Sequence, residues 1–139
     1  MDSTSITENN STDFRAYTTQ KAEIFKKILN ELEKVSKKSK EYFRNLLIKD
    51  DRIDNNLLEL YQFEIHGYAW FETYRIGLRE TYNWYTTLVE ANKLSGIDAN
   101  ILIYSFAEYL SQMKNGIMIS QTEMVRNNDL GLNDDDFGF

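Results

Sequence analysis

Apolar side chains recur every three or four residues through the first third of the chain, which is the spacing of one face of an α-helix. The pattern predicts a first long helix that begins after Thr12–Asp13 and runs to about Lys49. Residues 37–40 are all polar and interrupt the pattern, so we expect a weak point or an exposed turn there. The apolar positions of this helix are Ile24, Ile28, Leu32, Val35, Phe43, Leu46 and Leu47.

A second apolar stripe begins after Asp54, which has the side chain of a good N-cap, and continues to Leu94. Ser95–Gly96 then provides a stop signal. The stripe consists of Leu57, Tyr61, Ile65, Tyr68, Phe71, Leu78, Tyr82, Tyr85 and Val89. As one helix this stretch would be roughly 60 Å long, while a compact domain of this size has a radius of gyration of about 14 Å. Either Gly67 breaks the helix or the domain is elongated, and we favour the elongated form, which would leave apolar surface for a partner.

A third helix is predicted from Asp98, as its N-cap, to Asn115–Gly116. Its inward positions are Ala99, Leu102, Ile103, Phe106, Leu110 and Met113. Ser120 and Glu123 have the spacing of a capping box, which predicts the start of a short fourth helix. We find no strand-like alternation.

The predicted fold is all-α: an elongated antiparallel helical hairpin or bundle of three long helices plus a short C-terminal helix. The predicted division is a disordered leader over 1–12, one helical domain over 13–132 and an acidic, solubilising tail over 133–139. The chain of 139 residues has no proline and six glycines, so it has little material for tight turns, and hairpins are not expected.

Composition narrows the function classes. Without cysteine there can be no disulfide, thiolate metal site or cysteine nucleophile. The net charge of −6 argues against broad nucleic-acid binding, which needs a positive field. No apolar run approaches the ~20 residues that span a bilayer, and the polar first residues do not resemble a secretory signal. We therefore expect a cytoplasmic protein that contacts neither nucleic acid nor membrane.

His66, the only histidine, has two interpretations. It could act as a general base beside Glu64 or Glu72. The favoured interpretation is structural, with the imidazole packed among neighbouring aromatic side chains and one nitrogen hydrogen-bonded, because no second catalytic group is near in sequence.

Aromatic side chains crowd residues 66–85 and cover almost every side of the predicted helix. They could form a box for a flat ligand, but a central core helix is favoured, and a protein interface is the main remaining interpretation. The candidate interface residues are Trp70, Phe71, Tyr74, Tyr82, Trp84 and Tyr85.

Arg75 and Arg79 lie one helical turn apart and could grip a phosphate or carboxylate. Ion pairs with Glu72 and Glu80 in the same helix are favoured. The run Asp134–Asp136 lacks the pattern of a calcium loop. We accordingly assign no catalytic, cofactor-binding or metal-binding residue to this chain.

Two stretches, 66–84 and 106–132, resemble the helical N-terminal extension of acyl-CoA dehydrogenase relatives of the (2S)-methylsuccinyl-CoA dehydrogenase type. The resemblance spans roughly residues 50–132, and the run ISQTEMVRNNDLGL is its most specific part, with Met118 and Ile119 departing from the pattern. The matching residues are His66, Gly67, Ala69, Trp70, Leu78, Arg79, Glu108, Tyr109, Leu110, Gly116, Ile117, Ser120, Gln121, Glu123, Val125, Arg126, Asp129, Leu130, Gly131 and Leu132.

The resemblance implies a non-catalytic accessory module, since the flavin-binding sheet, acyl-CoA cleft and catalytic glutamate of the family belong to the dehydrogenase proper. FAD is expected only in a partner or in a missing catalytic part. The implied partner is an acyl-CoA dehydrogenase subunit or a second copy of this chain. Two alternatives stay open: the truncated front end of a split dehydrogenase gene, and a helical carrier of a small flat or acyl ligand.

Overall fold

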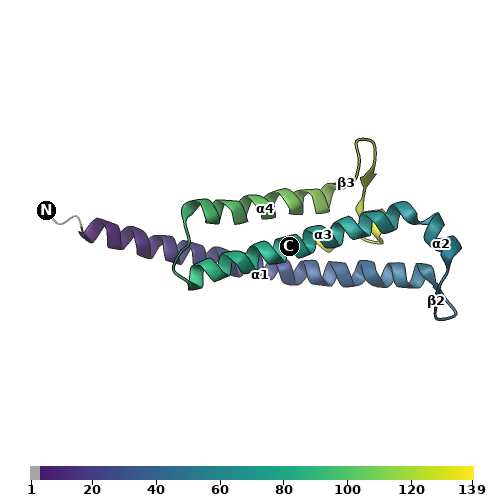
Figure 1. The fold of residues 1–139 in the computed structure, drawn as a ribbon, viewed down its shortest axis with the longest axis horizontal. Coiled ribbons are helices and arrows are strands. Elements are labelled where there is room, and N and C mark those ends of the chain that lie inside the picture. The colour runs from purple at the N-terminus through teal and green to yellow at the C-terminus, as the bar shows by residue number, and fades with distance from the viewer. Residues whose placement is uncertain (1–3) are drawn as a thin grey trace.

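The computed structural model describes the backbone of residues 4–139 and the side chains of Gln20 and residues 22–139. Three long helices lie side by side as a rod, each antiparallel to the next along the chain, with α3 in contact with both of the others (Figure 1). The predicted elongated, predominantly helical fold is confirmed. The three helices of the rod are α1 (Thr4–Leu47), α3 (Gln62–Glu90) and α4 (Gly96–Asn115).

Helix α1 is continuous through the polar residues 37–40, so the predicted weak point is wrong. Ser36 and Ser39 are buried, whereas Lys37, Lys38 and Lys40 are exposed. Small hydroxyl side chains therefore occupy the inward positions where the apolar pattern lapses.

The backbone of α1 is helical from Thr4, earlier than the predicted start after Asp13. The side chains of residues 1–19 and 21 lie outside the described part of the chain. A functional division into a leader, a helical domain and a tail stays a prediction.

The connection between α1 and α3 contains a tight hairpin that the sequence did not predict. Strands β1 (Ile48–Lys49) and β2 (Arg52–Ile53) pair in antiparallel register. Asp50 and Asp51 form the two-residue turn with φ values of 50° and 58°. Two successive positive φ values are the geometry of a type I′ turn, and aspartate tolerates it better than most residues. The turn is thus made without proline or glycine.

Helix α2 (Asn55–Leu60) begins at the predicted cap, because Asp54 accepts hydrogen bonds from the backbone N–H groups of Asn56 and Leu57. The break that separates α2 from α3 lies at Tyr61. Gly67, where a break was the alternative not favoured, is inside α3.

The N-cap of helix α4 is Ser95, so the predicted N-cap, Asp98, is wrong. A reciprocal pair of hydrogen bonds between the two residues shows this. The Ser95 hydroxyl accepts from the Asp98 backbone N–H at 3.3 Å, and the Asp98 carboxylate accepts from the Ser95 N–H at 2.8 Å. This is a capping box, which satisfies two N–H groups at the helix start. The predicted end at Asn115–Gly116 is confirmed.

The predicted fourth helix starting at Ser120 is wrong. Strands β3 (Ile117–Met118) and β4 (Met124–Val125) pair as a hairpin, and Ser120 lies in the turn between them. Its hydroxyl accepts from the backbone N–H of Thr122 and of Glu123, so the capping bonds close a turn that no helix follows. Ile117, buried beside an exposed Met118, shows the strand alternation that the sequence reading missed.

The C-terminal residues pack against the rod. Two short 3₁₀ helices follow β4: η1 (Asn127–Leu130) and η2 (Asp134–Phe137). Phe137 is only 3% exposed, and the Asp136 carboxylate pairs with the Lys38 ammonium at 2.7 Å. Part of the predicted acidic tail over 133–139 therefore packs on α1 and on the core.

The core runs the length of the rod, because each helix contributes fully buried side chains. Phe25 of α1 meets Phe106 of α4 with ring centroids 4.4 Å apart. The largest side chains with almost no exposed surface are Tyr85, Phe71, Phe106, Leu32, Leu78, Leu102 and Met113.

Candidate functional site

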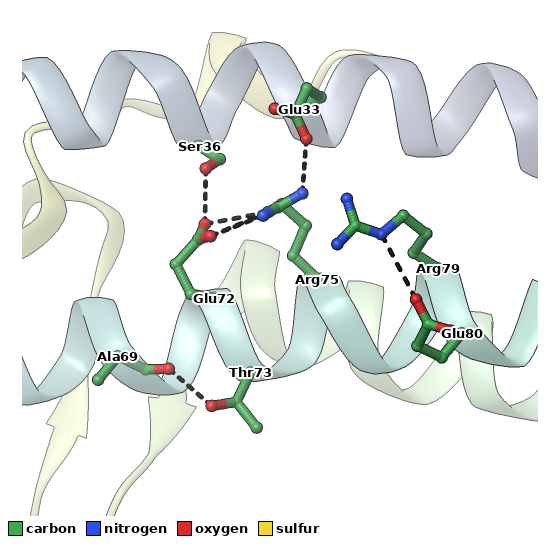
Figure 2. Close-up of polar contacts among 8 residues, drawn as sticks. All are labelled: Glu33, Ser36, Ala69, Glu72, Thr73, Arg75, Arg79 and Glu80. Atoms are coloured by element: carbon green, nitrogen blue, oxygen red, sulfur yellow. Dashed lines mark hydrogen bonds and ion pairs between the residues drawn. The ribbon is translucent and has the colours of Figure 1, made fainter.

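A polar cluster joins α1 to α3 near the middle of the rod; we call Glu33, Ser36, Glu72 and Arg75 the polar seam (Figure 2). The Glu72 carboxylate accepts from the Ser36 hydroxyl at 2.6 Å and from two nitrogens of Arg75 at 2.8–3.1 Å. Arg75 of α3 also forms an ion pair with Glu33 of α1. The predicted ion pair of Arg75 with Glu72 is confirmed, and Glu33 and Ser36 are partners that the sequence reading missed.

Within the polar seam, Arg75 pairs with both Glu72 and Glu33. Burial alone would raise the pKa of Glu72, but the hydrogen bonds from Arg75 and Ser36 outweigh it and hold that pKa below its ordinary value. The hydrogen bond to Glu72 raises the pKa of Arg75. Both groups stay charged at neutral pH, so neither is tuned to exchange protons there. The seam fixes how α1 lies against α3.

Arg79 is half exposed and approaches Glu80 at 3.7 Å, as predicted for the second intrahelical pair. An open pocket of about 290 Å³ lies beside it between α1 and α3. Its charged lining residues are Lys26, Arg75, Arg79 and Glu33. Arg75 and Arg79 are each paired with a glutamate, which weakens the positive field that an anion would meet.

The six candidate interface residues divide into core and surface. Phe71 and Tyr85 are 0% and 1% exposed, so their assignment to an interface is wrong: both point into the core. Tyr74 and Tyr82 are half-buried. Trp70 and Trp84 are 37% and 38% exposed, and these two keep a surface that a partner could cover.

Tyr74 connects this surface to α4. Its hydroxyl donates to the Gln112 side chain at 3.0 Å, and its ring lies 4.7 Å from that of Tyr109. The Trp70 ring meets Tyr74 edge-on at 5.9 Å. Tyr109, Tyr74 and Trp70 thus form a row of ring contacts, and the contact with Tyr74 helps to orient the Trp70 indole.

His66 is exposed and does not pack inside the aromatic cluster. Its Nε2 accepts a hydrogen bond from Nε1 of Trp70 at 3.2 Å, which places the imidazole proton on Nδ1. The nitrogen that a general base would use is therefore engaged in positioning a tryptophan.

The two stretches that carry the family resemblance meet at Gly67. Val125 of β4 packs on this glycine so closely that a methyl group there would lie within 2.9 Å of three Val125 carbon atoms. Only a glycine lets the hairpin β3–β4 approach α3 to this distance. Gly67 is thus explained by packing.

Five further residues of the resemblance lie near this contact, in the β3–β4 turn and at η1. Ser120, Gln121 and Glu123 lie in the turn between β3 and β4, with Gln121 exposed. Arg126 and Asp129 begin η1, where the Asp129 carboxylate accepts from the Arg126 backbone N–H at 2.7 Å. The Ser120 and Asp129 side chains thus hold the backbone of these turns through hydrogen bonds to N–H groups.

An open groove of about 580 Å³ lies between the start of α3 and the β3–β4 hairpin. We call it the hairpin groove. Its walls are mostly apolar, and sequence reasoning missed Phe63, Ile65 and Ile119 as lining residues. The sequence did contain a hint for Ile119, because it lies two residues after Ile117, and this is the spacing of side chains on one face of a strand. The lining residues are Gln62, Phe63, Ile65, His66, Ala69, Ile119 and Glu123.

Among the side chains that the structure describes, no three histidine or acidic residues come together as they would around a metal ion. None of the helices in the described chain combines the length and the apolar character needed to cross a bilayer.

Comparison with known proteins supports the resemblance read from the sequence. No protein-family model matches the chain. The chain is 32% identical over 104 residues to (2S)-methylsuccinyl-CoA dehydrogenase from Cereibacter sphaeroides. It is related to part of an acyl-CoA dehydrogenase. The match covers 75% of this chain, so it is longer than the stretch of residues 50–132 over which the resemblance was read. It covers only 19% of the dehydrogenase.

Proposed function

We propose that this chain is a non-catalytic helical module that associates with a flavin-dependent acyl-CoA dehydrogenase. The observation that carries the proposal is the match to a dehydrogenase: three quarters of this chain align with about a fifth of that protein. Most of this chain is a helical rod, and the resemblance implies that the part in common is the N-terminal extension. FAD and the acyl-CoA substrate would be held by the dehydrogenase.

The surface of the rod supports an association role. The hairpin groove, the exposed Trp70 and a row of exposed aliphatic residues near α2 leave apolar area at one end of the rod. Leu60 is 70% exposed and Ile53 is 60% exposed. Apolar patches of this kind are typical of protein–protein contacts.

The experiment is native mass spectrometry of the tagged chain, recovered gently from its own cells. The expected result is a complex of this chain with a second chain that carries FAD and oxidises an acyl-CoA thioester. Phe63→Asp, which places a carboxylate in the hairpin groove, should release that chain. Lys37→Asp on the exposed side of α1 is the matched control and should retain it.

Recovery of the chain alone, without flavin in any associated species, would contradict the proposal. It would favour the second interpretation, the front end of a split dehydrogenase gene. The DNA that follows the coding region decides that case, because a dehydrogenase sequence continuing in another frame identifies a split gene.

A small-ligand carrier is the second candidate function, and the hairpin groove is the observation that favours it. Its volume of about 580 Å³ is in the range of small-molecule sites. Mass spectrometry of the purified chain under native conditions tests this: a bound acyl or aromatic compound lost in Phe63→Asp supports a carrier, and a protein-only mass removes it.

A further inference from the structure

Both tryptophans of the chain lie on one outward stripe of α3, one heptad to either side of Gly77. Residues seven apart on a helix share a face, offset by about 20° per heptad. Trp70 and Trp84 are 37% and 38% exposed, and no atom of another element lies within 4 Å of where a Gly77 side chain would begin. We call Trp70, Thr73, Gly77, Glu80 and Trp84 the tryptophan face.

An exposed glycine in the middle of a helix is destabilising, and no contact among the described residues offsets this at Gly77. Glycine is about 1 kcal/mol less favourable than alanine there. Gly67 and Gly131 are explained by Val125 and Tyr42, which pack against them, but Gly77 has no such neighbour. Its place between two exposed indoles is suited to a helix that approaches closely from outside.

We infer that the tryptophan face is a homodimer contact, in which α3 of a second copy crosses in antiparallel orientation with Gly77 against Gly77. The spacing is symmetric about Gly77, so a two-fold axis at this residue places Trp70 of each copy beside Trp84 of the other. A self-complementary patch of this kind is what a two-fold dimer requires.

The polar groups of the face are compatible with this contact. Thr73 and Thr81 donate their hydroxyl protons to backbone carbonyls one turn earlier, so neither brings an unsatisfied donor. Glu80 is the charged residue of the face and stands three residues from the axis. The two Glu80 Cα atoms would thus be offset by about 9 Å along the helices, and each carboxylate would face Tyr74 of the other copy.

The size of the face predicts a weak dimer. Two heptads of α3 are about 21 Å long, and α4, which packs beside α3, also carries exposed apolar residues, Ile101 and Tyr104. A contact that included both helices, each about 10 Å wide, would bury roughly 400 Å² per copy, half of the ~800 Å² of a standard interface. We therefore expect a weak dimer, with a dissociation constant in the micromolar range or above.

The inference does not depend on a dehydrogenase partner, because the test uses the purified full chain alone. Sedimentation velocity between about 1 and 100 µM should show a shift from monomer to dimer, which spans a micromolar Kd. Tryptophan emission should shift to shorter wavelength over the same range, since both indoles lose water together. A monomer at all concentrations, with constant emission, would overturn the inference.

Substitution at Gly77 separates the contact from folding. Gly77→Ala should raise the Tm of the dilute monomer by a few degrees, because alanine favours a helix, while weakening dimerisation at least tenfold. Gly77→Leu should abolish the dimer, and Lys37→Leu on α1 should leave it intact. A dimer that survives Gly77→Leu would assign the contact to another face.

Cross-linking gives a third readout, because the chain has no cysteine of its own. Gly77→Cys lies on the proposed axis and should form a disulfide-linked dimer under mild oxidation, whereas Lys37→Cys should not. Equal cross-linking of the two variants would contradict the proposed orientation.

Discussion

The rod and the C-terminal segment, residues 116–139, are held in place by different kinds of contact. The rod is stabilised by rows of apolar side chains, each backed by others on the same helix face. The segment also buries apolar side chains in the same core, among them Val125, Leu130 and Phe137, but it adds close contacts to distant residues: Val125 on Gly67, Tyr42 against Gly131, and the Ser39 hydroxyl donating to the Leu130 carbonyl at 2.8 Å.

The difference is one of redundancy. A helix that loses one apolar neighbour retains the rest of its stripe, so the damage is proportional to the area lost. The segment has fewer buried apolar side chains than the rod, and its close contacts at Gly67 and Gly131 leave no room for a methyl group, so one added there can displace it. The predictions below separate these two behaviours, from the largest expected effect to the smallest.

Phe71→Ala should have the largest effect, because this side chain serves both regions. Phe71 is 0% exposed in the core of the rod, and its ring lies 6.4 Å from that of Phe137 in η2. Truncating a buried phenylalanine costs about 3–5 kcal/mol of unfolding free energy. Urea unfolding measures it, with Ile76→Ala on the same helix, 42% exposed, as a control expected below about 1 kcal/mol.

Gly67→Ala should detach the segment more than it weakens the rod. The new methyl group overlaps Val125, at a cost of about 1–3 kcal/mol that exceeds the helix gain from alanine. Hydrogen exchange should rise in residues 117–130 while α1 stays protected. Adding Val125→Ala should restore part of the protection; an equal loss in the double variant would exclude this packing account.

Acid should weaken the polar seam of the rod. The folded pKa of Glu72 lies below its ordinary value of 4.5, so its contribution is complete above that value and is lost as the pH falls through the folded pKa. Stability should therefore drop in the acid range. Glu72→Gln should lower the free energy of unfolding at neutral pH by about 1–2 kcal/mol and flatten the acid dependence. Parallel pH curves for the two proteins would contradict this.

Lys38→Ala should have the smallest effect, because its ion pair with Asp136 is exposed to water on the lysine side. Exposed pairs contribute about 0.2–1 kcal/mol and weaken with salt. Hydrogen exchange at η2 should increase slightly at low salt, and the difference from the parent should vanish at high salt. Lys37→Ala is the matched control, and an equal change there would remove the pairing explanation.

The helices of the rod were predictable because their apolar period repeats over many turns, and Asp54 and Gly116 marked two boundaries by local chemistry. The segment was not, since in this turn the Ser120 hydroxyl accepts from the Glu123 backbone N–H just as it would in a capping box. What separates the two outcomes is the pairing of Ile117 with Val125, which is a contact between strands.

The candidate site was predictable only in part for a related reason. The pair Glu72–Arg75 follows from helical spacing alone. Ser36 and Glu33 join it from another helix, which one-dimensional spacing does not reveal. Phe71 and Tyr85 were misassigned because α3 carries aromatic residues on nearly all sides, so its inward face is defined by where α1 and α4 lie.

The hydrogen bond from Ser39 to Leu130 also sets an order of events during synthesis on the ribosome. The two residues are 91 positions apart, so at about 5–20 residues per second the carbonyl follows the hydroxyl by about 5–18 s. During that interval the hydroxyl, which ends with 0% exposure, must be hydrated. The α1–α3 pair can therefore form early, but Ser39 is shielded from water only once Leu130 is in place.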